Sequence, residues 1–116
     1  MPDAELEKPD GIRVRLRGTC AIGRASSSGI VLKDVKVSRQ HALVQSQRQY
    51  EFWLLDLDSS NGTYVNGRRI TQPVLLRDQD HIEIGPFRLV FRQSKMGPAG
   101  PSEQTTSEQT LLTKKG

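Results

Sequence analysis

The chain has little of what disulfide frameworks, membrane spans and aromatic nucleic-acid platforms require. Cys20 is the only cysteine among 116 residues, which excludes an intrachain disulfide and a cysteine-based metal site. No apolar run approaches the roughly 20 residues of a membrane-spanning helix, and no signal-peptide pattern is visible. A cytoplasmic location is therefore expected, or a nuclear one in a eukaryote. Aromatic residues make up only 5% of the chain and are not interleaved with basic residues as single-strand binding requires.

Charge is distributed unevenly. Residues 12–93 hold 13 Lys and Arg residues against 7 Asp and Glu residues, a net of +6, whereas the whole chain carries +4. A basic folded region favours an anionic partner, which is nucleic acid, anionic lipid, or a phosphorylated or acidic protein. On charge alone, a basic surface that only aids solubility is an equally good interpretation.

Composition divides the chain into three parts. Residues 1–10 are acidic, contain proline and lack a period, so we expect a flexible lead. Residues 94–116 are rich in Gly, Pro, Ser, Thr and Gln and cannot bury enough apolar surface to offset their ordering entropy. We expect them to be a disordered tail, or a linker in a longer protein. Ser-Glu-Gln-Thr occurs there twice, at 102–105 and 107–110, either as low-complexity drift or as a duplicated docking or modification site.

Short alternating patterns predict an all-β domain over residues 11–93. Ile12, Val14 and Leu16 alternate with arginines, which is the period of a half-buried strand. Asn66-Gly67 is a strong two-residue hairpin signal because both positions tolerate positive φ. No segment has a convincing helical period. The spacing of the turn signals predicts an antiparallel β-sandwich of about 10–11 short strands. The expected strands cover 12–16, 20–23, 29–32, 41–47, 51–57, 63–65, 68–70, 74–76, 81–84 and 87–91.

Three polar segments follow expected strands: Gly23-Arg24, residues 38–41 and residues 59–67. Loops on a rigid sheet are where binding groups usually lie, and these supply a guanidinium, hydroxyls, an amide and turn glycines. Ser38 and His41 raise the question of nucleophilic catalysis. No Gly-x-Ser-x-Gly elbow is present, and no third group can be identified to orient the imidazole. We therefore expect no catalytic residue, no metal and no cofactor.

Taken in order, Gly23-Arg24, Ser38-x-x-His41, Asn61-Gly62-Thr63 and Val65-Asn66-Gly67 resemble the forkhead-associated (FHA) domain family. Each motif is weak alone, but the ordered set is specific and spans about 70% of the chain. The resemblance implies an eleven-strand β-sandwich that binds phosphothreonine peptides through the loops at one end. It also implies a role in Ser/Thr-kinase signalling without catalytic activity.

The resemblance assigns a role to individual residues. Those implied to bind the phosphopeptide are Arg24, Ser38, Arg39, Ser60 and Asn61, where Ser60 replaces a more usual Thr and keeps the hydroxyl. Those implied to be architectural are Gly23, His41, Gly62, Thr63, Asn66 and Gly67. Lys36 and Val37 lie on the loop that resembles the family's specificity loop, which selects the residue three positions after the phosphothreonine. A cationic Lys36 would favour an acidic residue there.

The N-terminal part departs from the family pattern. The family usually has a longer strand pair before Ile22-Gly23-Arg24. Either the first strand is missing here, or it is built from residues 5–8. A missing strand would leave an open sheet edge beside the last strand and invite self-association.

The implied partners are phosphothreonine-containing proteins, either Ser/Thr kinases or their substrates, with no small-molecule substrate and no membrane. Thr105, Thr106 and Thr110 are candidate phosphorylation sites, through which the tail would fold back to close the site or would link two molecules. Two alternatives stay open. One is an FHA-like interaction domain that works by sheet-face contacts without phosphate, and the more remote one is a nucleic-acid-binding β domain, which would lose affinity steeply with salt.

Overall fold

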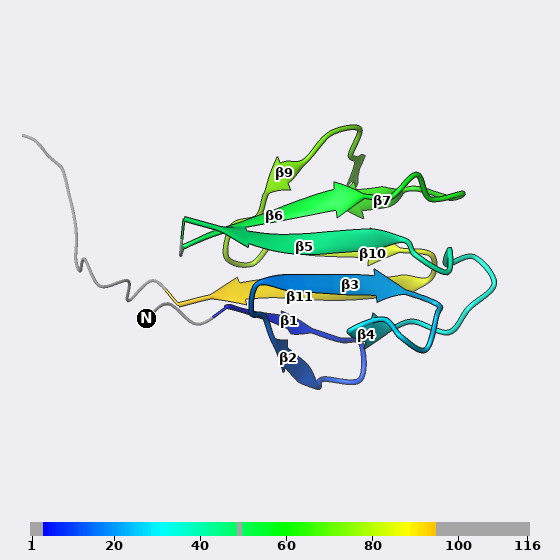
Figure 1. The fold of residues 1–116 in the computed structure, drawn as a ribbon, viewed down its shortest axis with the longest axis horizontal. Coiled ribbons are helices and arrows are strands. Elements are labelled where there is room, and N and C mark those ends of the chain that lie inside the picture. The colour runs from blue at the N-terminus through cyan, green and yellow to red at the C-terminus, as the bar shows by residue number, and fades with distance from the viewer. Residues whose placement is uncertain (1–3, 49, 95–116) are drawn as a thin grey trace, which may run out of the picture.

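The computed structural model describes residues 4–48 and 50–94 of the chain, and these fold into eleven strands without a helix (Figure 1). The prediction of an all-β sandwich is confirmed. No helix in this part of the chain is long and apolar enough to cross a membrane. The strands are β1 (Ala4–Glu7), β2 (Arg13–Arg15), β3 (Thr19–Gly23), β4 (Ile30–Val31), β5 (Ala42–Gln47), β6 (Glu51–Asp56), β7 (Thr63–Val65), β8 (Arg68–Arg69), β9 (Val74–Leu75), β10 (His81–Ile84) and β11 (Phe87–Gln93).

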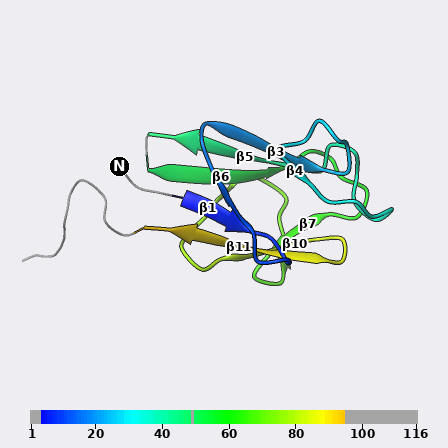
Figure 2. The same ribbon diagram turned by 90° about the horizontal axis from the view of Figure 1, so that it is seen from below.

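Two sheets form the two layers of the sandwich, as Figure 2 shows. One has six strands in the order β2-β1-β11-β10-β7-β8, and the other has five in the order β4-β3-β5-β6-β9. The ladders are antiparallel except between β3 and β4, which pair in parallel through Ile22 and Ile30. The Asn66-Gly67 hairpin is confirmed, because β7 and β8 pair across it with Tyr64 opposite Arg69.

The core lies between the sheets because alternate residues of each strand point inward. In β6, Phe52 and Leu54 are buried while Trp53 and Leu55 between and after them are half-buried. Phe52 meets Phe91 of the other sheet, with ring centroids 5.8 Å apart at an interplanar angle of 52°. Cys20 is half-buried against this core, and burial raises the pKa of its thiol.

The expectation of a flexible lead is wrong for residues 4–7, which form β1 between β2 and β11. Ala4 and Leu6 point into the core and are 1% and 0% exposed. Glu5 and Glu7 point outward, where Glu7 accepts a hydrogen bond from Arg92 Nε at 2.6 Å. Of the two alternatives for the first strand, the one that builds it from this region is correct. The edge of this sheet is therefore β2, and the postulated open edge beside β11 does not exist.

The alternation expected for residues 12–16 holds only in part. Leu16 is buried and Val14 packs against the core, but Ile12 is 56% exposed. The reason is local: Gly11 has a φ of 86° and Ile12 N–H is held by Asp10 Oδ1 at 2.9 Å, so Ile12 still belongs to the turn that follows β1.

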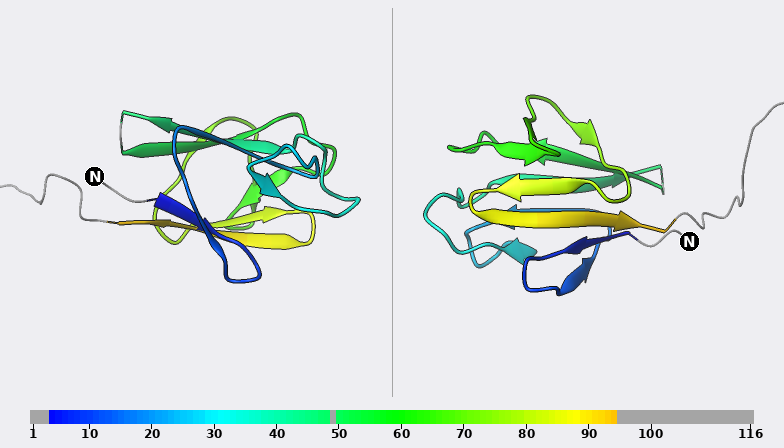
Figure 3. Two further views of the ribbon diagram at one scale, coloured as in Figure 1. Left: turned by 60° about the horizontal axis from the view of Figure 1, so that its bottom comes forward. Right: turned by 180° about the vertical axis from the view of Figure 1, so that it is seen from behind.

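The loops and the ends of the described chain lie at opposite ends of the sandwich. The β3–β4, β4–β5, β6–β7 and β10–β11 connections gather at one end (Figure 1). Ala4 pairs with Gln93 at the other end, and both views of Figure 3 show this separation. The expected tail from residue 95, with Thr105, Thr106 and Thr110, lies outside the described residues, so those predictions stay predictions.

Leu6→Ala should lower the free energy of unfolding by about 3 kcal/mol, because it opens a cavity at a fully buried position of a central strand. The matched control is Ile12→Ala, which removes a similar side chain from an exposed site and should change it by less than about 1 kcal/mol. Urea denaturation of the two variants measures both. A larger loss of stability in Ile12→Ala than in Leu6→Ala would contradict the burial of Leu6 in β1.

Candidate functional site

Three loops meet at the end of the sandwich that carries the predicted binding residues. The β3–β4 loop is tied to the β4–β5 loop by backbone bonds from Arg24 N–H to Ser38 O at 3.0 Å and from Ala25 N–H to Arg39 O at 3.1 Å. Gly23 permits this approach, since a Cβ atom there would collide with the carbonyl oxygen of Arg39. Gly23, expected to be architectural, is where the two loops come into contact.

His41 links the β4–β5 loop to the β6–β7 loop. Its imidazole is fully buried, and Nδ1 accepts a hydrogen bond from Ser38 N–H at 3.0 Å. The proton of the neutral ring therefore lies on Nε2, which donates to Gly62 O at 2.8 Å. Both ring nitrogens are engaged, so His41 cannot take a proton from the Ser38 hydroxyl. Its position suits a role in holding the loop.

Asp56 is the hub of the β6–β7 turn, and the sequence analysis did not single it out. Its Oδ1 accepts hydrogen bonds from Ser59 Oγ and Thr63 Oγ1, both at 2.6 Å. Its Oδ2 accepts one from Ser59 N–H at 3.0 Å. Ser59 Oγ in turn accepts from Gly62 N–H at 2.9 Å. The signal in the sequence is an Asp followed by Ser at the third position and Thr at the seventh.

The pKa of Asp56 reflects two opposing effects. Burial raises it, but the hydrogen bonds from Ser59 and Thr63 outweigh burial and hold the pKa below its ordinary value. The carboxylate is thus ionised at neutral pH and organises the turn through its charge.

Arg24 and Ser38 present unused polar atoms to solvent. Arg24 is exposed, and its Nε donates to Val37 O at 2.9 Å, which fixes the guanidinium while its two Nη nitrogens have no partner in the described chain. Ser38 is half-buried, and its Oγ accepts a hydrogen bond from Ser60 N–H at 3.0 Å. The hydroxyl hydrogen of Ser38 therefore remains available to a ligand.

Asn61 and the β4–β5 loop make a third tie. Asn61 Nδ2 donates to Lys36 O at 2.9 Å, which leaves its Oδ1 and its second N–H exposed to solvent. Lys36 and Arg39 are exposed on the same loop. Val37 lies in the expected loop, but its side chain is 1% exposed and belongs to the core. The Val37 side chain packs toward the Gly85 turn, where its Cγ2 would lie 3.1 Å from a Cβ atom at Gly85, so of the two residues expected on the specificity loop only Lys36 is exposed.

Asn66 and Gly67 lie away from this group, at the turn of the β7–β8 hairpin. Their φ angles are 51° and 85°, which are typical of the turn that Asn-Gly favours. The Asn66 side chain donates to Asp80 Oδ1 and accepts from His81 N–H, both at 2.9 Å. These contacts attach the hairpin to β10 and give Asn66 a structural position.

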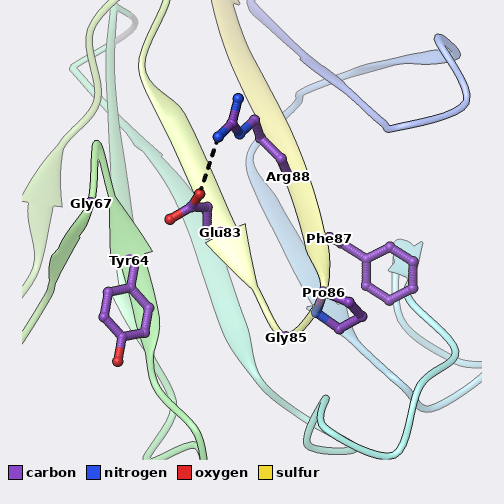
Figure 4. Close-up of a pocket in the computed structure, with 7 residues that line it drawn as sticks. All are labelled: Tyr64, Gly67, Glu83, Gly85, Pro86, Phe87 and Arg88. Carbon is purple, nitrogen blue, oxygen red and sulfur yellow. Dashed lines mark hydrogen bonds and ion pairs between the residues drawn. The ribbon is translucent and has the colours of Figure 1, made fainter.

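A depression of about 500 Å³ lies on the outer face of the six-stranded sheet near the β10–β11 turn. Figure 4 shows Tyr64 on one side of it and the Glu83–Arg88 pair on the other, with Arg88 Nη2 3.5 Å from Glu83 Oε2. Gly85 at its rim is adjacent to Lys36, whose Cβ would lie 3.5 Å from a Cβ at Gly85. The depression thus borders the loop group.

Exposed cations without an ion pair lie on the loops of this end and on the β7–β8 hairpin, and elsewhere in the described ranges at Arg15, Arg17, Arg48 and Arg77. Within the described ranges, the ion-paired cations are Lys8, Arg13, Arg88 and Arg92. The exposed cations of the loops and of the β7–β8 hairpin, none of which has an ion pair, are Arg24, Lys33, Lys36, Arg39, Arg68 and Arg69. The group therefore combines an ordered guanidinium, a hydroxyl and an amide among cations, which are chemical groups that suit an anion on an extended chain.

Asp56→Asn should destabilise the fold by about 1–3 kcal/mol at neutral pH, because it removes charge-assisted bonds to Ser59 and Thr63. The pKa of Asp56 is depressed in the folded state. Its contribution is therefore present above the ordinary value of about 3.9 and is lost as pH falls through the folded-state pKa.

Chemical denaturation of wild type and Asp56→Asn from pH 7 down to about pH 3 measures this. The stability difference should shrink over the acidic part of that range. Asp58→Asn is the matched control, since Asp58 is exposed in the same turn and Asn tolerates its φ of 57°. A difference between wild type and Asp56→Asn that is independent of pH would contradict the role of the charge.

Known proteins resemble this chain in sequence. It is 45% identical over 73 residues to the glycogen accumulation regulator GarA of Mycolicibacterium smegmatis, covering 63% of this chain and 45% of that protein. It is 44% identical over 85 residues to an oxoglutarate dehydrogenase inhibitor of Corynebacterium glutamicum, covering 73% and 54%. The chain thus spans about half the length of the curated relatives it matches.

Solved structures share the fold. Mycobacterium tuberculosis EmbR in complex with a low-affinity phosphopeptide has a TM-score of 0.73 and 35% identity, over 78% of this chain and 24% of that one. The MEK1 FHA domain in complex with the HOP1 pThr318 peptide has a TM-score of 0.68 and 27% identity, over 77% and 94%. Residues 20–85 match the family described as FHA domain. The chain belongs to the FHA domain family.

Proposed function

We propose that the loop end binds phosphothreonine peptides and recruits the proteins that carry them. The observation that carries the proposal is the arrangement of Arg24 and Ser38. Val37 O fixes the Arg24 guanidinium by its Nε, so both Nη nitrogens point to no protein acceptor in the described chain. Ser38, whose backbone N–H is held by His41, keeps its hydroxyl hydrogen. A phosphate can accept hydrogen bonds from both groups.

Relatives with bound peptide support this assignment. The EmbR structure holds a phosphopeptide and the MEK1 FHA domain holds a phosphothreonine peptide. Two of the curated relatives are named a regulator and an inhibitor, which agrees with a role in binding and not in catalysis. Asn61 follows Ser60, and its amide oxygen has no hydrogen bond within the described chain; it would contact the backbone of an extended peptide.

The energetics suit reversible recognition. A phosphate carries a charge of about −1.5 to −2 and three acceptor oxygens, and a hydrogen bond to a charged group contributes about 1.5–3 kcal/mol. Two or three such bonds, less the ordering of the peptide, correspond to micromolar affinity, near −8 kcal/mol. Because the loops are tied to one another before any ligand arrives, little of this free energy is needed to order the site.

The remaining expectations are parts of the proposal. The partners would be Ser/Thr kinases or their substrates, met in the cytoplasm. Thr105, Thr106 and Thr110 would, when phosphorylated, compete for the same loops, which would make the domain self-regulated. Acidic residues three positions after the phosphothreonine would be favoured by Lys36, which is exposed next to Asn61.

The five-stranded sheet favours a second candidate function, protein contact without phosphate. Several of its outward positions carry apolar side chains, with Gln45 among them opposite Trp53, whereas the outer face of the six-stranded sheet carries Glu and Arg residues that pair with each other. Apolar patches of this kind mark interaction surfaces. The half-buried residues are Ala21, Leu43, Trp53, Leu55 and Leu75.

An NMR titration of the full chain with a pooled phosphothreonine peptide library and with its unphosphorylated counterpart tests the proposal. Shifts around Arg24, Ser38 and Asn61 are expected with the phosphorylated pool alone. Arg24→Gln and Ser38→Ala should each weaken binding about 10- to 100-fold, the equivalent of one charge-assisted hydrogen bond.

Arg15→Gln is the matched control, because it removes an exposed arginine of β2 on the outer face of the six-stranded sheet and should leave binding unchanged. Equal responses to both pools would reject phosphate recognition. Shifts confined to Leu43, Trp53 and Leu55 would instead favour the sheet-face function.

A further inference from the structure

The β7–β8 hairpin brings Arg69 back to the loop that carries Asn61. Thr63 begins β7 directly after Asn61-Gly62, and β8 returns antiparallel to it with Arg69 opposite Tyr64. Ile70 N–H donates to Thr63 O at 2.9 Å, which closes the ladder beside the loop. A residue eight positions further along the chain thus becomes a neighbour of the site.

The Arg69 side chain packs against the backbone at Gly62. A Cβ atom at Gly62 would lie 2.7 Å from Nε, 3.0 Å from Cζ and 3.2 Å from Cδ of Arg69. Gly62 also has a φ of 89°, a conformation that favours glycine. Its carbonyl oxygen is fixed by His41. Glycine at this position therefore allows both the positive φ of the turn and the close packing of the Arg69 guanidinium against the backbone.

The charge of Arg69 is uncompensated in the described part of the chain. The residue is exposed, and its guanidinium has neither an ion pair nor a hydrogen bond there. The arginines Arg13, Arg88 and Arg92 of the same sheet all pair with Glu residues. Arg69 differs from them because its side chain packs against Gly62, while its guanidinium N–H groups have no acceptor in the described part of the chain.

Arg24 and Arg69 approach the turn that carries Asn61 from different elements, Arg24 from the end of β3 and Arg69 from β8. A chain of contacts runs from Arg24 through the β4–β5 loop to Ser38, from Ser38 Oγ to Ser60 N–H, and along the turn to Gly62 and Arg69. A single phosphate at Arg24 and Ser38 leaves Arg69 without a counterion. A peptide held at Asn61 has one flank on the Arg69 side.

We propose that Arg69 forms a second anion site and that the preferred ligand is a phosphothreonine peptide with a second anionic group on one flank. This rests on the proposed function. The shared chemistry is an oxyanion, either a second phosphate or a carboxylate side chain, that the planar guanidinium binds through two parallel hydrogen bonds. Beyond Arg69 the surface continues to Tyr64 and the depression in Figure 4, which leaves room for the flank.

The test uses a phosphothreonine peptide of otherwise neutral residues and two scans of it. In one scan phosphoserine, and in the other glutamate, replaces each residue from about four positions before to four after the phosphothreonine. Apart from any gain at the third position after the phosphothreonine, which the proposed function assigns to Lys36, fluorescence anisotropy with the full chain should find one flank where the second anion raises affinity about tenfold, the equivalent of one charge-assisted hydrogen bond. A larger gain with phosphoserine identifies a second phosphate, and equal gains identify an acidic side chain.

Arg69→Gln should abolish that gain while the parent peptide loses less than about threefold, and Arg69→Lys should keep part of it because charge without the planar fork remains. Arg15→Gln, on the other edge of the same sheet, should keep the whole gain. The amide NMR spectrum of each variant reports that the hairpin is folded.

The inference is overturned if no position raises affinity in the wild type, or if the gain survives in Arg69→Gln. Binding of the parent peptide without any gain would leave the proposed function intact and reject only the second site. Failure of the parent peptide to bind at all would reject both.

Discussion

The buried imidazole of His41 is the constraint on which the loop end depends. Its ring accepts from the Ser38 backbone and donates to the Gly62 backbone, and its own backbone bonds to Ile22 and Leu57 place it between β3 and the end of β6. A neutral imidazole offers one donor and one acceptor on opposite sides of a rigid ring, which matches one N–H and one carbonyl across the gap between two loops. A buried imidazole whose donor and acceptor are both hydrogen-bonded keeps the two loops in a fixed relative position.

The residues proposed to bind the ligand also tie the loops together. Arg24 uses Nε on one loop and leaves its Nη nitrogens free, Ser38 accepts from a neighbouring loop and keeps its proton, and Asn61 donates one hydrogen and keeps the rest of its amide. Each side chain therefore has one fixed end and one open end. Order that exists before binding reduces the entropy lost on binding. Asp56 orders the β6–β7 turn in the same way, through its hydrogen bonds to Ser59 and Thr63.

The parts of the fold that depend on local chemistry could be predicted from the sequence. Asn66-Gly67 specifies its turn by its own torsions, and the alternation in 41–47 and 51–57 specifies two strands. A first strand near Ala4–Glu7 could be named only as one of two alternatives, because an alternation over four residues is too short to be decisive and the partner Arg92 of Glu7 lies 85 residues away. Val37 looked like a loop residue and is buried because Gly85, far along the chain, packs beside it. Arg69 carried no signal, since only the return of the hairpin makes it a neighbour of Gly62.

The pairing of Ala4 with Gln93 has an architectural consequence. The domain begins and ends at a single point, on the side of the sandwich furthest from the loops (Figure 1). A host protein can therefore carry it as an insertion in a surface turn as readily as at a terminus, because two adjacent attachment points impose no stretch on either chain. In each of these placements the loop end faces outward from the host, so the same loops stay exposed whatever the order of the domains.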